Sequence, residues 1–308
     1  MSFASDIKNE LLRAENKTEC CAIAELCGII CYAGSISYTD DEMELRIATE
    51  SAAAARRCFA LLKRVFGIAG DVNFARGRSG RGGNAYHILV TGEDTVNIVL
   101  YGLYLYDERY LGHISFRVNP VVEESACCKK AFIRGAFLGG GSITNPEKAY
   151  HLEFITHHLN LSRDMERLLE SFGTTPKTVL RKSNYVTYFK SGDEIGDVLS
   201  IIGAHKSLLE FMNIRIMKET RNYVNRKVNC ETANLDKTLD AAFLQVSAIK
   251  KIKKAGKFEA LPQTLKEPAL LRLRYKDASL KEIGNMLGLT KSGVNHRFRK
   301  IIEISEKL

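Results

Sequence analysis

The chain has 308 residues, of which 45% are hydrophobic and 26% charged, and a net charge of +9 at pH 7. This length allows two domains with separate cores, and the composition is typical of a soluble globular protein. No apolar run approaches the roughly 18–20 residues of a membrane-spanning helix, and charged residues follow Met1 too soon for a signal peptide. We therefore expect a cytoplasmic protein that makes no contact with a membrane.

The cysteine pattern argues against a metal site. Cysteines stand at positions 20, 21, 27, 31, 58, 127, 128 and 230, and no two of them form a C-x-x-C pair. The C-x-x-C spacing is typical of zinc sites, and its absence makes zinc binding the weaker interpretation. Reduced, buried thiols in a cytoplasmic protein account for the pattern more simply. We predict no metal and no cofactor.

The front half of the chain contains an internal repeat at an offset of 107 residues. The identities that define it, with the second copy in parentheses, are Cys20 (Cys127), Cys21 (Cys128), Ala24 (Ala131), Gly28 (Gly135) and Gly34-Ser35-Ile36 (Gly141-Ser142-Ile143).

Both copies, at about 19–106 and 126–203, predict the same order of elements. In the first copy these are a helix at 19–33, a strand at 43–47, an amphipathic helix ending at Gly67, a strand at 85–90 and a helix at 92–106. In the second copy they are a helix at 126–140, a strand at 151–155, an amphipathic helix ending at Gly173, a strand at 184–190 and a helix at 192–203. Two such units predict a pseudo-twofold α+β domain over residues 1–221.

Small residues mark the first helix of each copy. A glycine inside a helix costs roughly 1 kcal/mol relative to alanine, so Gly28 and Gly135 require a compensating contact. The simplest arrangement packs the two repeat helices against each other at the pseudo-twofold axis, where small side chains let the backbones approach closely.

A glycine-rich loop at 73–84 is longer than its counterpart in the second copy and carries Arg76, Arg78 and Arg81. These arginines are candidates for contacts with nucleic-acid phosphates. A solvated hairpin tip explains the same composition, and the sequence leaves both interpretations open.

The C-terminal part is predicted to be an all-α domain at 233–308. Residues 222–232 are rich in asparagine and arginine without a clear period, which predicts a linker after a helix at 205–223. Helices at about 233–254, capped by Thr232, and 262–275 should follow it. The first of these has an apolar stripe at Leu235, Leu239, Ala242, Val246 and Ile249.

Residues 279–301 have the layout of a helix-turn-helix. Ser279 and Glu282 form a capping-box pattern at the start of its first helix. Gly288 breaks that helix in the turn, and Thr290 caps the second helix.

The second helix of this motif has two different faces at about 100° per residue. Val294, Phe298 and Ile301 share the face expected to meet the core. The opposite face suits a recognition helix in the major groove, where arginine reads guanine and asparagine reads adenine. A solvated helix face is the alternative. The candidate base-facing residues are Ser292, Asn295, His296 and Arg299, and the candidate phosphate-binding residues are Lys291, Arg297 and Lys300.

The entire basic excess lies in the C-terminal region. Residues 1–221 contain 27 lysines plus arginines and 27 acidic residues, whereas residues 222–308 contain 18 and 9. A basic surface attracts polyanions through counterion release. We therefore predict that this region binds double-stranded DNA.

Residues 27–35 and 134–142, in the two repeat helices, resemble the motif of the LAGLIDADG homing endonucleases. The resemblance implies that these helices form the interface between the repeats. It also implies that an acid before the final glycine binds the metals that cleave DNA, but these degenerate metal positions hold Ala33 and Gly140.

Hydrolysis with Mg²⁺ needs oxygen ligands, so we predict no catalytic residues, no nuclease activity and no enzyme. Asp40 and Glu147, again 107 residues apart, are an alternative pair of ligands. Their turn-like contexts favour simple solvation.

The residues Met1–Ser5, the degenerate motif helices, the segment 225–235 and the segment 291–297 together resemble the WhiA family over nearly the whole chain. The resemblance implies a bacterial, nucleoid-associated DNA-binding regulator of transcription linked to cell division, chromosome segregation and, in sporulating bacteria, sporulation. It also implies a helix-turn-helix similar to the promoter-reading region of sigma factors, with a sigma factor or RNA polymerase as a partner. The alternatives are a divergent metal-dependent homing endonuclease or RNA maturase, and an interaction scaffold in division.

Overall fold

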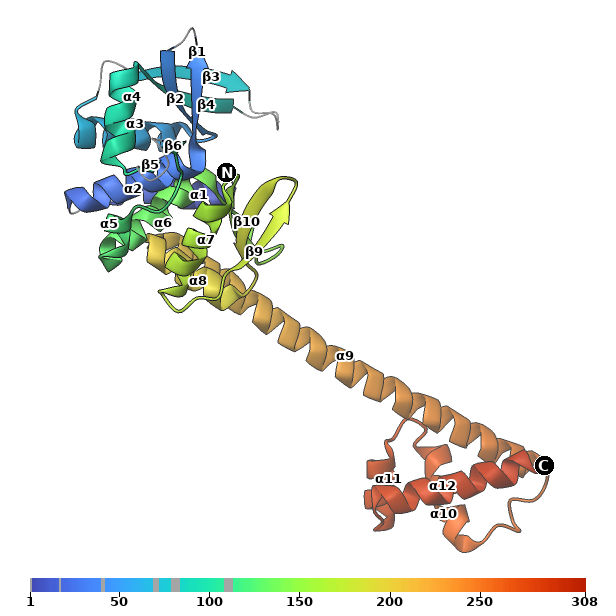
Figure 1. The fold of residues 1–308 in the computed structure, drawn as a ribbon. Helices are drawn as coiled ribbons and strands as arrows, with labels where there is room; N and C mark the ends of the chain where they lie inside the picture. Colours follow the sequence, from blue (N-terminus) through green and yellow to red (C-terminus); the bar gives the residue numbers. More distant parts are fainter. Residues whose placement is uncertain (1, 17, 40–41, 69–71, 79–83, 108–112) are drawn as a thin grey trace. The chain divides into compact units, whose positions relative to one another are not determined.

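A computed structural model describes residues 2–16, 18–39, 42–68, 72–78, 84–107 and 113–308 (Figure 1). Contacts divide the chain into two compact units, Met1–Lys218 and Glu219–Leu308. Each unit has its own apolar core. None of the described helices combines the length and the hydropathy that a membrane span requires.

The first unit contains the same arrangement twice, each time a long helix followed by strands and helices in one order. After α1 (Phe3–Leu11), the first copy consists of α2 (Glu19–Ala33), β1 (Gly34–Thr39), β2 (Glu42–Thr49), α3 (Ala52–Phe66), β3 (Val72–Arg78), β4 (Asn84–Thr91) and α4 (Glu93–Gly102). The second copy consists of α6 (Ala126–Gly140), β7 (Gly141–Ile143), β8 (Leu152–Thr156), α7 (Leu159–Glu170), β9 (Lys177–Arg181), β10 (Asn184–Phe189) and α8 (Gly192–Ile202). Between the copies lie β5 (Tyr106–Asp107), β6 (His113–Ile114) and α5 (Pro120–Glu123).

The two four-stranded antiparallel sheets have matching topology. Their strand orders are β1-β2-β4-β3 and β7-β8-β10-β9. The register also repeats, because Ile36 pairs with Leu45 in one sheet and Ile143 with Leu152 in the other. The predicted α+β fold with a pseudo-twofold front domain is therefore confirmed.

Alternating hydrophobicity gives each sheet one buried face. In β2, Met43, Leu45 and Ile47 point into the core, while Glu44 and Arg46 lie on the other face, as the two-residue period of a strand requires. The glycines predicted to follow the amphipathic helices adopt left-handed conformations, with φ of 71° at Gly67 and 82° at Gly173.

Helices α2 and α6 pack against each other at the centre of the first unit, as predicted (Figure 1). A Cβ atom on Gly28 would lie 2.3 Å from the carbonyl oxygen of Phe132, and one on Gly135 would lie 2.0 Å from that of Glu25. No other residue type fits such distances, so this contact explains the glycines inside both helices.

The second unit is all-α, also as predicted. Its elements are the C-terminal part of α9 (His205–Lys254), α10 (Gln263–Arg274), α11 (Leu280–Leu287) and α12 (Lys291–Glu306). Ala248, Ile249 and Ile252 of α9 contribute to its core.

The linker expected at 222–232 is instead part of α9, a single helix of 50 residues. Thr232 lies inside this helix and caps nothing. Asparagine lowers helix propensity by less than about 0.7 kcal/mol per residue, and residues 205–254 contain neither glycine nor proline to break the helix. The expected apolar stripe is covered only toward its end, because Ala242 and Ile249 are buried whereas Leu235 and Leu239 are exposed.

Candidate nucleic-acid interface

Helix α11 begins with the predicted capping box. The Ser279 hydroxyl accepts a hydrogen bond from the Glu282 amide at 3.3 Å, and the Glu282 carboxylate accepts one from the Ser279 amide at 2.7 Å. Hydrogen bonding from the backbone amide of Ser279, and secondarily from its side chain, lowers the pKa of the Glu282 carboxyl group. The charged carboxylate also suits the positive end of the helix dipole.

A tight turn connects α11 to α12. Gly288 ends α11 in the left-handed conformation, with φ of 65°. A Cβ atom on Gly284 would lie only 2.6 Å from the carbonyl oxygen of Leu289, so the returning chain needs glycine at that position too. The Thr290 hydroxyl accepts a hydrogen bond from the Gly293 amide at 3.2 Å and starts α12. The sequence therefore encodes both helix ends of the motif.

Burial fixes which face of α12 points outward. Val294, Phe298 and Ile301 are fully buried and pack with Ile283 of α11 and the other core residues of the second unit. The predicted core-facing side of the helix is confirmed. The exposed side of α12 lies opposite these core residues.

The predicted base-facing residues lie on the outward side of α12. Ser292, His296 and Arg299 are exposed, and Asn295 is half-buried at the edge of the same face. The predicted phosphate-binding residues flank them, with Lys291 and Lys300 exposed and Arg297 half-buried. In the described part of the chain, no hydrogen bond or ion pair engages any of these seven side chains.

The two predicted degenerate metal positions, Ala33 and Gly140, are the last residues of α2 and α6. A Cβ atom on Gly140 would lie 2.9 Å from Cδ1 of Tyr32 and 2.9 Å from the carbonyl oxygen of Ile155. The ring of Tyr32, packed edge-on against Phe154 with centroids 6.3 Å apart, leaves no room for a carboxylate there. Burial raises the pKa of Tyr32, so its hydroxyl stays protonated and supplies no anionic ligand.

The alternative acidic pair receives no support. Glu147 is exposed, and its amide donates to the side-chain oxygen of Asn145 at 2.8 Å, which is the turn geometry that its sequence context indicates. Asp40 lies outside the described residues. In the glycine-rich segment, Arg76 and Arg78 belong to strand β3 instead of a loop, and Arg81 lies outside the described residues.

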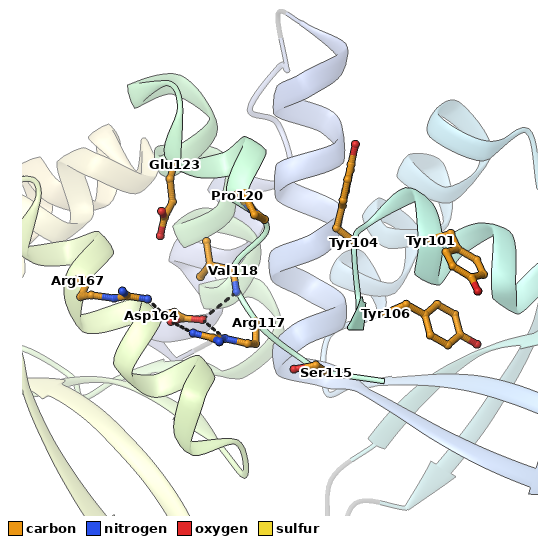
Figure 2. A pocket seen from close by; sticks show the side chains of 10 residues that line it. All are labelled: Tyr101, Tyr104, Tyr106, Ser115, Arg117, Val118, Pro120, Glu123, Asp164 and Arg167. Carbon is orange, nitrogen blue, oxygen red and sulfur yellow. Dashed lines mark hydrogen bonds and ion pairs between the residues drawn. The ribbon is translucent and has the colours of Figure 1, made fainter. Parts of the chain in front are cut away.

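A cavity of about 560 Å³ in the first unit is lined by charged and aromatic side chains (Figure 2). Its buried carboxylate, Asp164, accepts hydrogen bonds from Nε and Nη2 of Arg117 at 3.0 and 2.9 Å and from the Val118 amide at 3.3 Å. Arg167 donates to the same carboxylate (Figure 2). This acid is saturated with donors, so it anchors the segment between β6 and α5 and is unsuited to act as a catalytic base.

Three family models match successive parts of the chain. They are the WhiA N-terminal LAGLIDADG-like domain at residues 19–106, the WhiA LAGLIDADG-like domain at 129–221 and the WhiA C-terminal HTH domain at 224–305. The chain belongs to the WhiA family. The family assignment predicted from the sequence is confirmed.

Relatives in the WhiA family match the chain over its full length. Probable cell division protein WhiA of Alkaliphilus metalliredigens is 43% identical over 313 aligned residues, covering 100% of this chain and 98% of the relative. The protein of the same name from Thermoanaerobacter sp. is 47% identical with the same coverage. The crystal structure of full-length DUF199/WhiA from Thermatoga maritima matches with 28% identity and a TM-score of 0.60, covering 100% of this chain and 99% of that one.

The WhiA fold also brings together residues that the sequence interpretation missed. Glu25 of α2 is completely buried and pairs with Arg57 of α3 at 2.8 Å and with Arg134 of α6 at 2.9 Å. Arg272 of α10 is buried at the centre of the second unit. A charge placed inside an apolar helical pattern was the available signal for both residues.

Proposed function

We propose that this WhiA-family chain is a non-enzymatic, sequence-specific double-stranded DNA-binding protein that regulates transcription in cell division. The observation that carries the proposal is the outward face of α12. It presents an arginine, an asparagine, a histidine and a serine that have no partner among the described residues, flanked by three basic side chains. Hydrogen-bonding groups at the centre and cations at the edges match base edges and phosphates in a major groove.

Base readout predicts a specific pattern of mutant effects. Arg299→Ala and Asn295→Ala should each weaken binding to the preferred site by about 1–3 kcal/mol, or roughly 5- to 150-fold in Kd. Binding to unrelated DNA should change much less. Fluorescence anisotropy with fragments recovered by chromatin immunoprecipitation, compared with scrambled fragments, measures both effects. Equal losses on both kinds of DNA, or none at all, would contradict base reading by this face.

Phosphate contact predicts a different pattern for Lys300→Ala. Binding should weaken by a similar factor on every sequence, and the slope of log Kd against log salt concentration should fall by about one. Lys307→Ala provides a charge-matched control, because Lys307 follows the last residue of α12. An unchanged salt slope for Lys300→Ala, or the same change for Lys307→Ala, would remove Lys300 from the interface.

The front half of the chain fits a structural role as a scaffold better than a role as a nuclease. Its former metal positions are apolar, and Tyr32 fills the space beside Gly140. We expect the purified chain to leave supercoiled DNA intact in the presence of Mg²⁺ or Mn²⁺.

We also propose protein partners and cellular processes for this chain. The resemblance of the helix-turn-helix to the promoter-reading region of sigma factors supports RNA polymerase or a sigma factor as a partner. The relatives' name supports a role in cell division. We extend the proposal to chromosome segregation, to sporulation in sporulating bacteria and to association with the nucleoid. Co-purification with RNA polymerase that survives nuclease treatment of the DNA would test the partner directly.

A further inference from the structure

Two pairs of adjacent cysteines lie at the N-terminal ends of the two central helices. Cys20 and Cys21 are the second and third residues of α2, and Cys127 and Cys128 hold the same positions in α6. The sulfur atoms of Cys20, Cys21 and Cys128 all lie within 4.8 Å of one another. In the described part of the chain, these three form the only group of potential metal ligands of this kind.

The register of the helix contact explains why the cysteines come together. Gly135 lies against Glu25 and Ile29, and Gly139 lies against Ile29 and Ala33, so the residue numbers rise together along both helices. The helices are therefore parallel, and their N-termini are neighbours. The repeat therefore places the two adjacent-cysteine pairs next to each other, although neither pair is informative as a single motif.

The fourth cysteine, Cys127, precedes Cys128 and holds in α6 the position that Cys20 holds in α2. Its sulfur lies 3.3 Å from the hydroxyl of Ser125, and the sulfur of Cys20 lies 3.1 Å from the hydroxyl of Thr18. Ser125 and Thr18 are the N-cap residues of the two helices, so the two thiols have equivalent surroundings.

We infer that Cys20, Cys21, Cys127 and Cys128 bind a single zinc ion at the pseudo-twofold axis. Tetrahedral zinc with Zn–S bonds of about 2.3 Å holds its sulfur ligands about 3.8 Å apart. The sulfurs of Cys20, Cys21 and Cys128 already lie within 4.8 Å of one another, and rotation of the Cys127 side chain would complete the set. Four thiolates around Zn²⁺ carry a net negative charge, and the positive ends of two helix dipoles stabilise it.

The surroundings allow a metal to enter and be held. Cys21 and Cys128 are buried, while Cys20 and Cys127 are exposed. A largely apolar cavity of about 290 Å³, lined in part by Cys20 and Cys128, opens beside the cluster. Zinc would therefore tie together the first turns of α2 and α6, and binding energy at such a site adds to folding stability.

The test is the metal content of the full-length chain purified in the presence of a thiol reductant. Elemental analysis should find one zinc ion per chain in the wild type and little in the Cys20→Ser/Cys127→Ser variant. Cys230→Ser is the matched control, because Cys230 is an exposed cysteine of α9 far along the chain, and it should retain zinc. A chelator should lower the melting temperature of the wild type and of Cys230→Ser, but not that of the double variant.

Substitution with Co²⁺ gives a readout that does not depend on any variant folding. Four thiolates should produce intense sulfur-to-cobalt charge-transfer absorption and the visible bands of tetrahedral cobalt. Absence of these bands together with absence of zinc would overturn the inference. Zinc retained by the double variant, or mass-spectrometric detection of a disulfide between the repeats in the reduced preparation, would also overturn it.

Discussion

Replacing Glu25 with alanine is expected to destabilise the first unit by about 3–5 kcal/mol. The Glu25 carboxylate is inaccessible to solvent and accepts hydrogen bonds from Arg57, Arg134 and Asn16. Removing it leaves two arginine side chains, 17% and 11% exposed, without their counter-charge. Truncation of one partner in a buried ion pair is costly because the remaining charges stay desolvated.

Chemical denaturation of the full chain, followed by a probe in the first unit, measures this loss. Glu19→Ala is the matched control: Glu19 begins the same helix but is exposed, so only a few tenths of a kcal/mol of helix-dipole interaction are at stake. Glu25→Gln preserves the shape but not the charge and should fall between the two. A loss below about 1 kcal/mol for Glu25→Ala would show that the arginines find water or other acceptors.

Local patterns predict much of this fold. Strand alternation, the glycines that end helices, and the capping signals at Ser279 and Thr290 act over a few residues, and the structure contains all of them. The repeat adds long-range information, because two copies that each expose a glycine-containing helix can bury it only against one another. The position of the α2–α6 contact therefore follows from Gly28 and Gly135.

Features that depend on particular partners in space are harder to predict. The middle of α9 has no apolar face that packs on a core. Its sequence therefore lacks the helical period of hydrophobic residues and resembles that of a linker. Asp164 and Arg117 meet through folding and not through any motif. The candidate recognition face could be predicted because it lies opposite the core face of the same helix. That core face, with Val294 and Phe298, has a clear helical period of buried hydrophobic residues.

The contacts of the two central helices suit a structural role for the first unit. Here Tyr32 fills the space beside Gly140, and Glu25 links α2 to α3 and α6. The centre of the first unit is thus arranged to hold the two repeats together, in agreement with our proposal that the second unit reads DNA.

Arg272→Ala should unfold the second unit and abolish specific DNA binding, although Arg272 is absent from the proposed interface. The buried guanidinium donates from Nε to Gln245 of α9 at 2.9 Å and from Nη1 to the carbonyl of Lys276 at 3.2 Å. It also donates to the carbonyl of Ala278, just before α11, and lies 5.3 Å from the ring centroid of Phe298 in α12. This side chain of α10 therefore contacts α9, α12 and the segment that leads into α11.

The expected loss for Arg272→Ala is about 3–5 kcal/mol, from a cavity and several buried acceptors left without donors. Arg274→Ala removes an equal charge two residues along the same helix, from an exposed site, and should retain both stability and binding. Arg272→Met restores the side-chain volume but not the hydrogen-bond donors. This variant should therefore remain unstable if the hydrogen bonds of Arg272 contribute most of the stabilisation. Thermal melts and anisotropy measured on the same samples would separate the outcomes. A stably folded Arg272→Ala chain that fails to bind would place Arg272 in the DNA interface, and one that binds normally would show that apolar packing alone positions α12.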